Sequence, residues 1–448
     1  MTKDEILLTT TTSHVHLVHK IPISKPIAVD WKLFNVVAGE ILYNAVHIMN
    51  DAVAMHYLHQ KEKRNYKQKY GIALNVRNVY GVNSYTTVIS RELKEKYKEQ
   101  HLPGDLLEQI IRRAINTFRT NASKIMKHQA TLMTFRKNQP IPVRGRDLKL
   151  TDTYTVTLPL MSQETAQKYG FTGKHRQSFE AQLNPHKAAK IILDRILNGT
   201  YAIMDSSIQR TKDNKWYLLL NYKQPVQQTS IDKNTIVGVD LGVNKAAYLA
   251  VNHSKQNFFI DGGEVKAFRN RIRGRRRSLQ HQLRVCSSNR RGHGQKTLLK
   301  PLETLRKKEA DFNALTNHRY AKRIVDWAEK QGAGTIQLED LSDVISSNLH
   351  QKVLKNWTYF DLASKIEYKA KAKGLQIIKV QPSYTSQRCY NCGVIDKESR
   401  VSQAIFHCRT CHYKTNADLN AARNISLKNI ESIIQEQLKI QKAQTKTT

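Results

Sequence analysis

The alternation of hydrophobic and polar positions predicts strands and helices in turn along the first part of the chain. Residues 5–24 alternate polar with apolar side chains, which is typical of a strand. From Trp31 to about Leu58, apolar residues recur at the period of an amphipathic helix. We expect a basic loop at Lys61–Lys69 and a second helix near 84–98.

A third helix is expected after the chain break at Pro103-Gly104. Asp105 and Glu108 have the spacing of an N-terminal capping box. The apolar residues that follow share one helical face: Leu107, Ile110, Ile111, Ala114, Ile115 and Phe118. Together the three helices predict a helical subdomain whose apolar stripe is ordinary core.

Beyond Pro142 the period returns to two. Residues 147–159 are predicted to form a strand, and a helix over 185–198 ends at Gly199. The segments 201–210 and 216–222 flank a polar turn and predict a β-hairpin. These strands and the N-terminal one make a single β-rich module, into which the helical subdomain is inserted.

The second half of the chain begins with a buried strand, 236–240, that ends in an acid. The apolar stretches 246–251 and 258–261 predict the next two strands, which is how an RNase H-like sheet opens. A helix over 317–330 then leads into a strand that ends at Glu339 and Asp340.

Composition narrows the class of partner. The 448 residues include 73 Lys+Arg against 37 Asp+Glu, a formal net charge of +36. So large an excess predicts binding to a polyanion, with nucleic acid ahead of a membrane surface. The sequence has neither a long apolar run nor the apolar start of a secretion signal, so we expect a cytoplasmic protein with no membrane association.

Four of the five cysteines form two Cys-x-x-Cys pairs near the C-terminus. This spacing is typical of a structural zinc site with four thiolate ligands and does not suggest a disulfide scaffold. We therefore predict one zinc ion, bound by Cys389, Cys392, Cys408 and Cys411.

Three acidic segments suggest a second kind of metal site. Asp240 ends its strand among glycines, which we expect to leave room for metal and phosphate. Alternation sends Glu339 and Asp340 to opposite faces, and the pattern does not choose between them. Asn416 is a predicted N-cap, placing Asp418 in a first helical turn, where the helix dipole favours its ionised form. Three carboxylates suit a pair of Mg²⁺ or Mn²⁺ ions that hydrolyse phosphodiesters.

Four segments resemble the split RuvC nuclease and zinc ribbon of transposon-encoded TnpB proteins and type V CRISPR effectors, most of all the miniature type V-F group. They are Val237-Gly-Val-Asp-Leu-Gly-Val, Thr335-Ile-Gln-Leu-Glu-Asp-Leu, Tyr384-Thr-Ser-Gln-Arg-Cys-x-x-Cys-Gly and Asn416-Ala-Asp-x-Asn-Ala-Ala-Arg-Asn-Ile. The resemblance is strong from about 233 to 430 and looser upstream.

The resemblance implies a prokaryotic RNA-guided DNA endonuclease that cuts both strands at one RuvC site. It implies a catalytic triad of Asp240, Glu339 and Asp418, which also chooses Glu339 over Asp340. It further implies a guide RNA, a short flanking motif in double-stranded target DNA, and an asymmetric homodimer on one guide RNA.

The expected architecture is multidomain, α+β and α/β, in which a β-rich wedge with an inserted helical recognition domain precedes a split RuvC (RNase H-like) domain. The predicted boundaries are wedge strands at 1–27, recognition domain at 28–138, wedge module at 139–223, linker at 224–232, first and second RuvC acidic segments with a basic insert at 233–383, zinc-ribbon module at 384–415, third acidic segment with C-terminal helix at 416–440, and tail at 441–448.

Basic clusters give the expected nucleic-acid contacts. Six arginines fall within nine residues, a pattern that a solvated helix face or a nuclear-import patch could also produce. We favour contacts with the nucleic-acid backbone for Arg269, Arg271, Arg273, Arg275, Arg276, Arg277, Arg290, Arg291, Arg388 and Arg409.

Other functions share parts of these patterns. A TnpB nuclease would use an RNA derived from a transposon. A guided repressor would bind DNA without cutting it, although the intact acids argue against this. A DDE-type transposase has an overlapping fold and acids but would join strands as well as cleave them.

Overall fold

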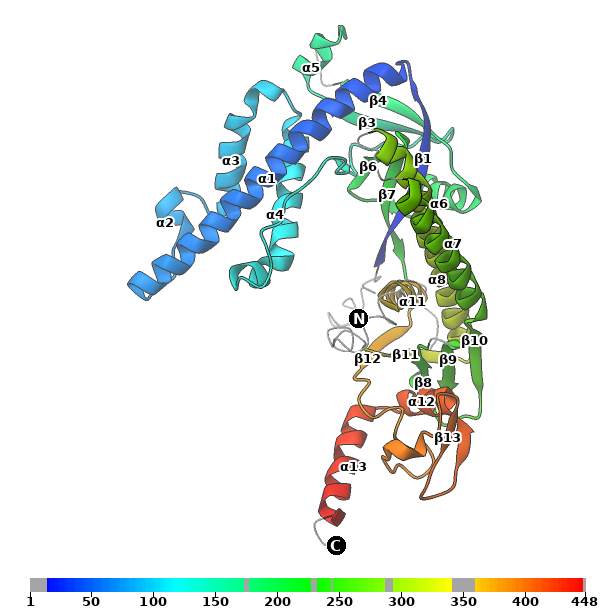
Figure 1. Cartoon of the computed structure of the whole chain (residues 1–448). Coiled ribbons are helices and arrows are strands. Elements are labelled where there is room, and N and C mark those ends of the chain that lie inside the picture. Colours follow the sequence, from blue (N-terminus) through cyan, green and yellow to red (C-terminus); the bar gives the residue numbers. More distant parts are fainter. Residues whose placement is uncertain are drawn as a thin grey trace, which may run out of the picture. The chain divides into compact units, whose positions relative to one another are not determined.

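The computed structural model describes residues 14–172, 177–226, 232–242, 245–286, 293–340 and 359–445. The chain divides into two compact units, one spanning His16–Pro225 and the other comprising Met1–Val15 and Val226–Thr448 (Figure 1). Each unit has a β-sheet and a hydrophobic core of its own.

The first unit is built on a seven-stranded sheet with strand order β2-β6-β7-β1-β4-β3, in which β5 also pairs with β7. Its strands are β1 (His14–Ile27), β2 (Ile141–Val143), β3 (Thr155–Met161), β4 (Gln177–Leu183), β5 (Ala202–Ile203), β6 (Ser206–Arg210) and β7 (Trp216–Pro225). The predicted hairpin is confirmed, since β6 and β7 pair antiparallel.

Helices α1 to α4 come between β1 and β2 in the chain. The helices of this unit are α1 (Trp31–Tyr70), α2 (Val76–Tyr80), α3 (Tyr85–Lys96), a 3-10 turn at Lys98–Gln100, α4 (Gly104–Met126), α5 (Gln163–Lys168) and α6 (Lys187–Leu197). After α6, Gly199 adopts a positive φ of 77°, as its predicted role at the helix end requires.

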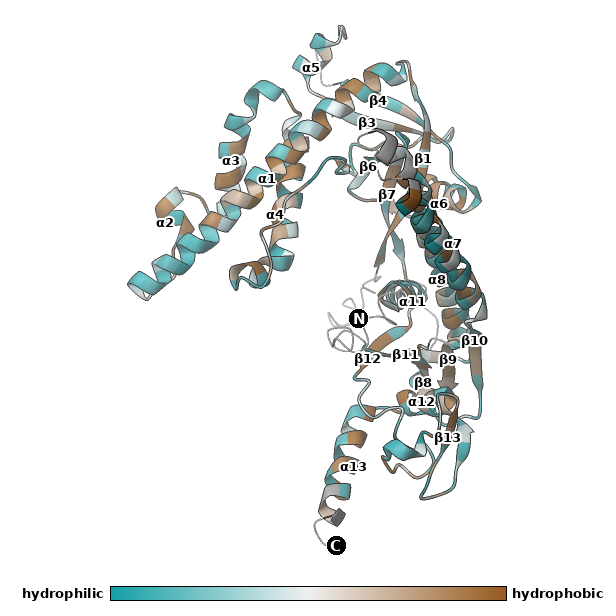
Figure 2. Ribbon diagram, in the orientation of Figure 1, coloured by the Kyte–Doolittle hydropathy of each residue, from teal (hydrophilic) through white to brown (hydrophobic). Residues whose placement is uncertain are grey.

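The first helix begins against the sheet and is longer than the sequence pattern predicts. Phe34 packs edge-on against Phe179 of β4 and Trp216 of β7, with ring centroids 5.2 and 5.3 Å apart. The expected loop at Lys61–Lys69 is wrong, because α1 continues to Tyr70 (teal at this end in Figure 2). Lysine, glutamine and glutamate are good helix formers and need no apolar partner to continue a helix.

Two further expectations are corrected in this unit. Helix α4 begins at Gly104 with Pro103 at its N-cap and no side-chain cap, so there is no capping box. Asp105 instead lies inside the first turn, 3.8 Å from the guanidinium of Arg144. The strand expected over 147–159 is shifted, because the chain turns until Tyr154, which has a φ of 58°, and β3 begins only afterwards.

The second unit holds a five-stranded sheet of order β10-β9-β8-β11-β12. The first three strands form the predicted antiparallel meander, and β11 runs parallel to both β8 and β12. The strands are β8 (Asp232–Asp240), β9 (Lys245–Val251), β10 (Asn257–Asp261), β11 (Ala333–Glu339) and β12 (Gln376–Val380).

Helices cover both faces of this sheet. Val237, Val239, Ile336 and Leu338 enter a core shared with α8 and α11. The opposite face carries α12, in contact with β8 and β9. The helices are α7 (Gly263–Cys286), α8 (His293–Lys330), α11 (Tyr359–Ala372), α12 (Ala417–Ile425) and α13 (Ile430–Thr445), with a 3-10 turn at Lys397–Ser399 and the hairpin β13 (Ile405–His407) and β14 (Lys414–Asn416).

Candidate active site

Asp240 stands at the end of β8, on the face that meets α12. A Cβ added at Gly238, on the same face, would lie 2.3 Å from the carbonyl oxygen of Ala422. The helix therefore packs directly against the strand backbone. The expectation that this glycine leaves room for metal and phosphate is wrong, because the backbone of α12 occupies that space.

The strand β11 brings the second acid to the same face. Ile336 and Leu338 point into the core, so Gln337 and Glu339 point the other way. The Gln337 amide indeed lies against the carbonyl oxygen of Leu427, directly after α12, at 3.4 Å. Glu339 is consequently on the face that Asp240 shares.

The choice between Glu339 and Asp340 is thus made by the sheet. The Thr385 hydroxyl donates a hydrogen bond of 2.7 Å to Glu339 Oε1 and so orients that carboxylate. Asp340 follows the end of β11, and its backbone N–H donates to the carbonyl oxygen of Val380 on β12.

The third acid, Asp418, sits in the first turn of α12. The predicted N-cap is confirmed: the Asn416 side-chain oxygen accepts hydrogen bonds from the backbone N–H groups of Asp418 and Leu419, at 2.9 and 3.1 Å. Asp418 Oδ1 lies 3.9 Å from Arg400 Nη2. The structure thereby brings together the three acids that the sequence singled out, from two strands and one helix.

Burial dominates the electrostatics of these carboxylates. It raises the pKa of Asp240 well above its usual value, and the nearby Glu339 and Asp418 charges raise it further. It also raises the pKa of Glu339 and of Asp418, although Arg400 opposes the shift at all three acids. Burial thus opposes the stabilisation of ionised Asp418 that the helix dipole was expected to give. At Asp240 the charges of the two neighbouring acids contribute to this rise, and a bound cation would offset their repulsion.

Sequence reasoning missed three residues around this cluster. Arg400 faces all three acids from the segment between the two cysteine pairs, where no local pattern distinguishes it. Tyr359, at the start of α11, is buried, and burial together with nearby Asp240 raises its pKa. Thr385 did lie within a recognised motif, and only its hydrogen bond reveals its role.

The four predicted zinc ligands form one cluster. Among the described residues, this is the group of histidines, cysteines and acids whose ligand atoms all lie within 4.8 Å of one another. Burial raises the pKa of Cys389 to about 12, whereas the Asn391 amide and backbone N–H groups lower that of Cys411 to about 6. Four sulfur ligands at this separation fit a single tetrahedral metal ion.

Buried asparagines join the cysteine cluster to α12. Asn420 and Asn424 are both 0% exposed. Their amides donate to the carbonyl oxygen of Arg388, at 2.8 and 2.7 Å, and Asn424 also donates to that of Thr385 at 2.9 Å. The segment that carries Cys389 is therefore fastened to the helix that carries Asp418.

This packing corrects the role expected of Arg388. Its side chain is buried at 8% exposure, and its guanidinium donates to Asn424 Oδ1 at 2.7 Å. It supports the loop from within and is not open to a phosphate. Arg409, by contrast, is exposed and pairs with Glu398.

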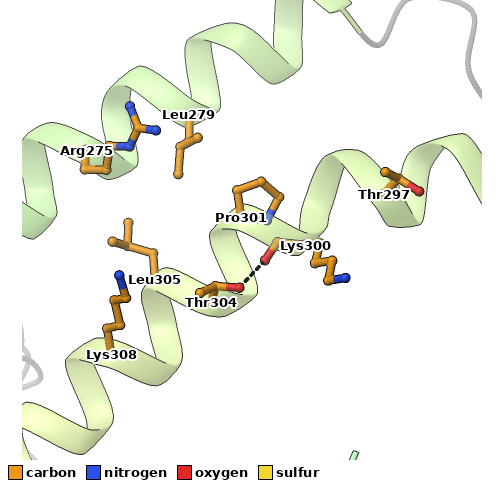
Figure 3. Close-up of a pocket in the computed structure, with 8 residues that line it drawn as sticks. All are labelled: Arg275, Leu279, Thr297, Lys300, Pro301, Thr304, Leu305 and Lys308. Atoms are coloured by element: carbon orange, nitrogen blue, oxygen red, sulfur yellow. Dashed lines mark hydrogen bonds between the residues drawn. The ribbon is translucent and has the colours of Figure 1, made fainter. Parts of the chain in front are cut away.

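Two arginines of the cluster on α7 are engaged within the protein. Arg276 pairs with Glu309 of α8, and Arg269 is half-buried, so both help to hold the two helices together. Leu279 and Leu305 face each other between the helices (Figure 3). The arginines of this cluster that remain exposed are Arg271, Arg273, Arg275 and Arg277, while Arg290 and Arg291 lie outside the described residues.

Two carboxylates on a mixed sheet and a third on the helix that covers it, beside a four-cysteine cluster in a strongly basic chain, define a nucleic-acid enzyme. A family model described as "Cas12f1-like, TNB domain" matches residues 359–425, from α11 to the end of α12. This range contains the cysteine cluster, Arg400 and Asp418.

Whole-chain comparisons give the family. The chain is 36% identical to the CRISPR-associated endodeoxyribonuclease Cas12f1 of Sulfoacidibacillus thermotolerans, over 94% of this chain and 99% of that one. It is 38% identical to the Cas12f1 of Syntrophomonas palmitatica, over 77% and 76% of the two chains. The chain belongs to the Cas12f family of miniature type V-F CRISPR-associated nucleases, which is related to TnpB.

A solved structure agrees on the fold. The cryo-EM structure of a Cas12f1–sgRNA–target DNA complex superposes with a TM-score of 0.68 at 20% identity, covering 92% of this chain and 99% of that chain. More distant in sequence, the putative RNA-guided DNA endonuclease InsQ of Escherichia coli is 29% identical over 47% of this chain and 53% of its own length. No helix in the described part of the chain is both long and apolar enough to cross a membrane.

Proposed function

We propose that this protein binds a guide RNA and hydrolyses both strands of a matching double-stranded DNA at one RuvC-type site. The observation that carries the proposal is the meeting of Asp240, Glu339 and Asp418 on one face of a mixed sheet. The names of its relatives support the nucleic-acid partners, since the solved Cas12f1 is held with sgRNA and target DNA.

The three acids are the proposed catalytic residues because their oxygen atoms suit hard divalent cations. A pair of Mg²⁺ or Mn²⁺ ions held by these three acids would supply activation of water and charge stabilisation of the leaving 3′ oxygen. The Thr385 hydrogen bond fixes the carboxylate of Glu339. Arg400 Nη2 lies 3.9 Å from Asp418 Oδ1, and its positive charge would offset negative charge at this site.

The cysteine cluster is proposed to hold one structural zinc ion through Cys389, Cys392, Cys408 and Cys411. Small metal-stapled segments owe their folding to the metal. Because Asn420 and Asn424 fasten this segment to α12, an ordered ribbon keeps Thr385 and Asp418 in place.

The remaining parts of the architecture follow from the same proposal. The β-rich sheet of the first unit would serve as the wedge and helices α1 to α4 as the recognition domain, which hold the guide RNA. The exposed arginines of α7 would contact the backbone of the guide–target duplex. Assembly as an asymmetric homodimer on one guide RNA, with a short flanking DNA motif, completes the proposal.

The test is reconstitution with RNA. The protein would be purified with its co-expressed guide RNA, and cleavage of a matched DNA duplex measured with Mg²⁺. We expect cleavage only when both the guide RNA and a divalent cation are present. Cleavage without guide RNA, or joining of the cut strands, would refute the proposal in favour of another nuclease or a transposase.

A further inference from the structure

A row of side chains crosses the sheet of the second unit from the acid cluster to the edge of the sheet. Asp240 on β8 is directly opposite Tyr248 on β9, and Tyr248 is directly opposite Phe259 on β10. Side chains directly opposite each other lie on one face of a sheet. That face is the one α12 covers, because Tyr248 packs against Ala422. The row thus begins at an acid and ends at an aromatic ring on the edge strand β10.

Phe259 is open to solvent at the end of this row. Its ring lies 5.6 Å from that of Tyr248, at an angle of 31°, and the residue is 44% exposed. Its neighbours on β10, Phe258 and Ile260, instead pack into the core on the other face. A single exposed aromatic residue carries no argument by itself. What distinguishes Phe259 is its register with Asp240 and the charge beside it.

A β-bulge brings a lysine to the same face. Three positions separate Lys245 from Tyr248, so in a regular strand their side chains would point to opposite faces. The register of β9 against β10 shifts by one residue between them, and such a bulge re-aims the side chain beyond it. Lys245 Nζ lies 4.3 Å from the centroid of the Phe259 ring. Burial raises the pKa of Asp418, and Lys245 opposes the rise together with Arg400.

An aromatic ring with an ammonium group beside it suits a single strand of nucleic acid, because the ring stacks on a base and the cation attracts a phosphate. Lys245 pairs with Asp261 at 3.1 Å, and this exposed carboxylate is a weak partner that a phosphate can replace. Neighbouring strands lie about 4.8 Å apart, so two strand spacings put Phe259 about 10 Å from Asp240. Nucleotides that stack at about 3.4 Å each cover this distance in about three nucleotides.

We propose that Phe259 stacks on a base of the DNA strand that enters the acid cluster, a few nucleotides from the scissile phosphate, while Lys245 attracts a phosphate of the same strand. The inference rests on the proposed function and names residues that hold its substrate. A single strand is favoured over a duplex, since the bases of a duplex are already stacked on one another and their faces are not free for a side chain.

The experiment uses the full protein with its guide RNA and a guide-matched DNA duplex. In each substrate one nucleotide near the cut is made abasic, in the strand that does not pair with the guide RNA. Cleavage of that strand is measured in a single turnover. For the wild type we expect one abasic position to slow cleavage about tenfold, because the base that stacks on Phe259 is missing.

Phe259→Ala should cleave intact DNA about tenfold more slowly and show no further slowing at that abasic position, since the ring and the base act as one pair. Phe259→Trp should restore the wild-type rate. The matched control is Ile378→Ala, which removes an exposed apolar side chain from β12, the opposite edge strand of the sheet. This control should keep both the rate and the sensitivity to the abasic position.

Lys245→Gln tests the charge. It should slow cleavage, and the loss should shrink as salt is added, because salt screens the attraction between the ammonium group and phosphate. A loss that does not change with salt overturns the role of Lys245.

Two outcomes overturn the role of Phe259. One is a wild-type rate of Phe259→Ala on intact DNA, and the other is slowing at the abasic position that is equal in Phe259→Ala and wild type. A lowered Tm with a slow rate that Phe259→Trp does not restore would show a structural role and also overturn it, as would loss of guide RNA binding. Wild-type protein that fails to cleave intact DNA with guide RNA refutes the proposed function instead.

Discussion

The carboxylate cluster and the cysteine cluster gather anionic ligands in opposite ways. The four cysteines come from two short motifs whose spacing alone predicts their meeting. The three acids come from two strands and a helix, and only the packed sheet assembles them. Burial disfavours the ionised form in both clusters, because it raises the pKa of Asp240 and of Cys389. Keeping these groups ionised therefore costs free energy unless a cation is bound. The cysteine cluster is local in sequence, so its ligands can meet before the rest of the domain folds. The carboxylate cluster is distributed along the chain, so its residues meet only once the sheet and α12 have packed.

The largest effect is expected at the distributed cluster. Asp240→Asn keeps the shape of the side chain but removes a charged metal ligand. We expect cleavage to be about a thousandfold slower, which corresponds to the loss of several kcal/mol of transition-state stabilisation. Guide-dependent DNA binding should persist. Asp232→Asn, at the exposed start of the same strand, is the matched control, and equal cleavage by the two variants would contradict the assignment.

Disruption of the cysteine cluster should also slow cleavage, but through loss of folding in the loop that carries it. Cys408→Ser or a strong chelator should remove zinc and loosen the loop that Asn420 and Asn424 fasten to α12. We expect cleavage to fall about 10- to 100-fold, as when the support of a site is lost, with a lower Tm and less zinc by elemental analysis. Cys286→Ser, outside both pairs, should change none of these. Full cleavage activity without zinc would show that the carboxylate cluster does not depend on the cysteine cluster.

Arg400 lies between the two cysteine pairs in the sequence, and its charge lowers the pKa of all three acids. Metal binding requires ionised carboxylates, so cleavage should rise with pH until the acids have lost their protons. Arg400→Ala should move that rise to higher pH, because it removes the charge that favours ionisation. The pH–rate profile measures the shift, with Arg409→Ala as the control. An unmoved profile would show that Arg400 does not act on the acids.

The smallest expected effect is on the free energy of unfolding of the metal-free protein. A buried acid with a raised pKa binds its proton more tightly in the folded state, so its ionisation destabilises the fold as pH rises above the unfolded pKa of about 4. Metal-free Asp240→Asn should therefore be more stable than wild type at neutral pH, by about 1–3 kcal/mol. The difference should vanish in acid. Denaturant titrations at pH 4 and pH 7 measure it, and equal stabilities at both would contradict the burial effect.

Local signals were enough for much of the chain. The β6–β7 hairpin, the Asn416 cap and the four-cysteine cluster all depend on neighbours within a few residues or on one spacing. Predictions from local patterns were wrong where two conformations of a segment have similar local free energies. The polar end of α1 could have been loop or helix, and Asp105 could have capped α4 but lies inside it.

The sequence by itself determined the basic charge, the cysteine cluster and the acidic segments, because composition and short spacings do not depend on how the chain folds. The alternation pattern left Glu339 and Asp340 open, and the tertiary structure shows that Glu339 shares the face of Asp240, since that depends on which face of β11 receives α12. It also decided that Arg388 is buried while Arg400 faces the acids. Side-chain contacts between distant segments are set by packing, which no local pattern encodes.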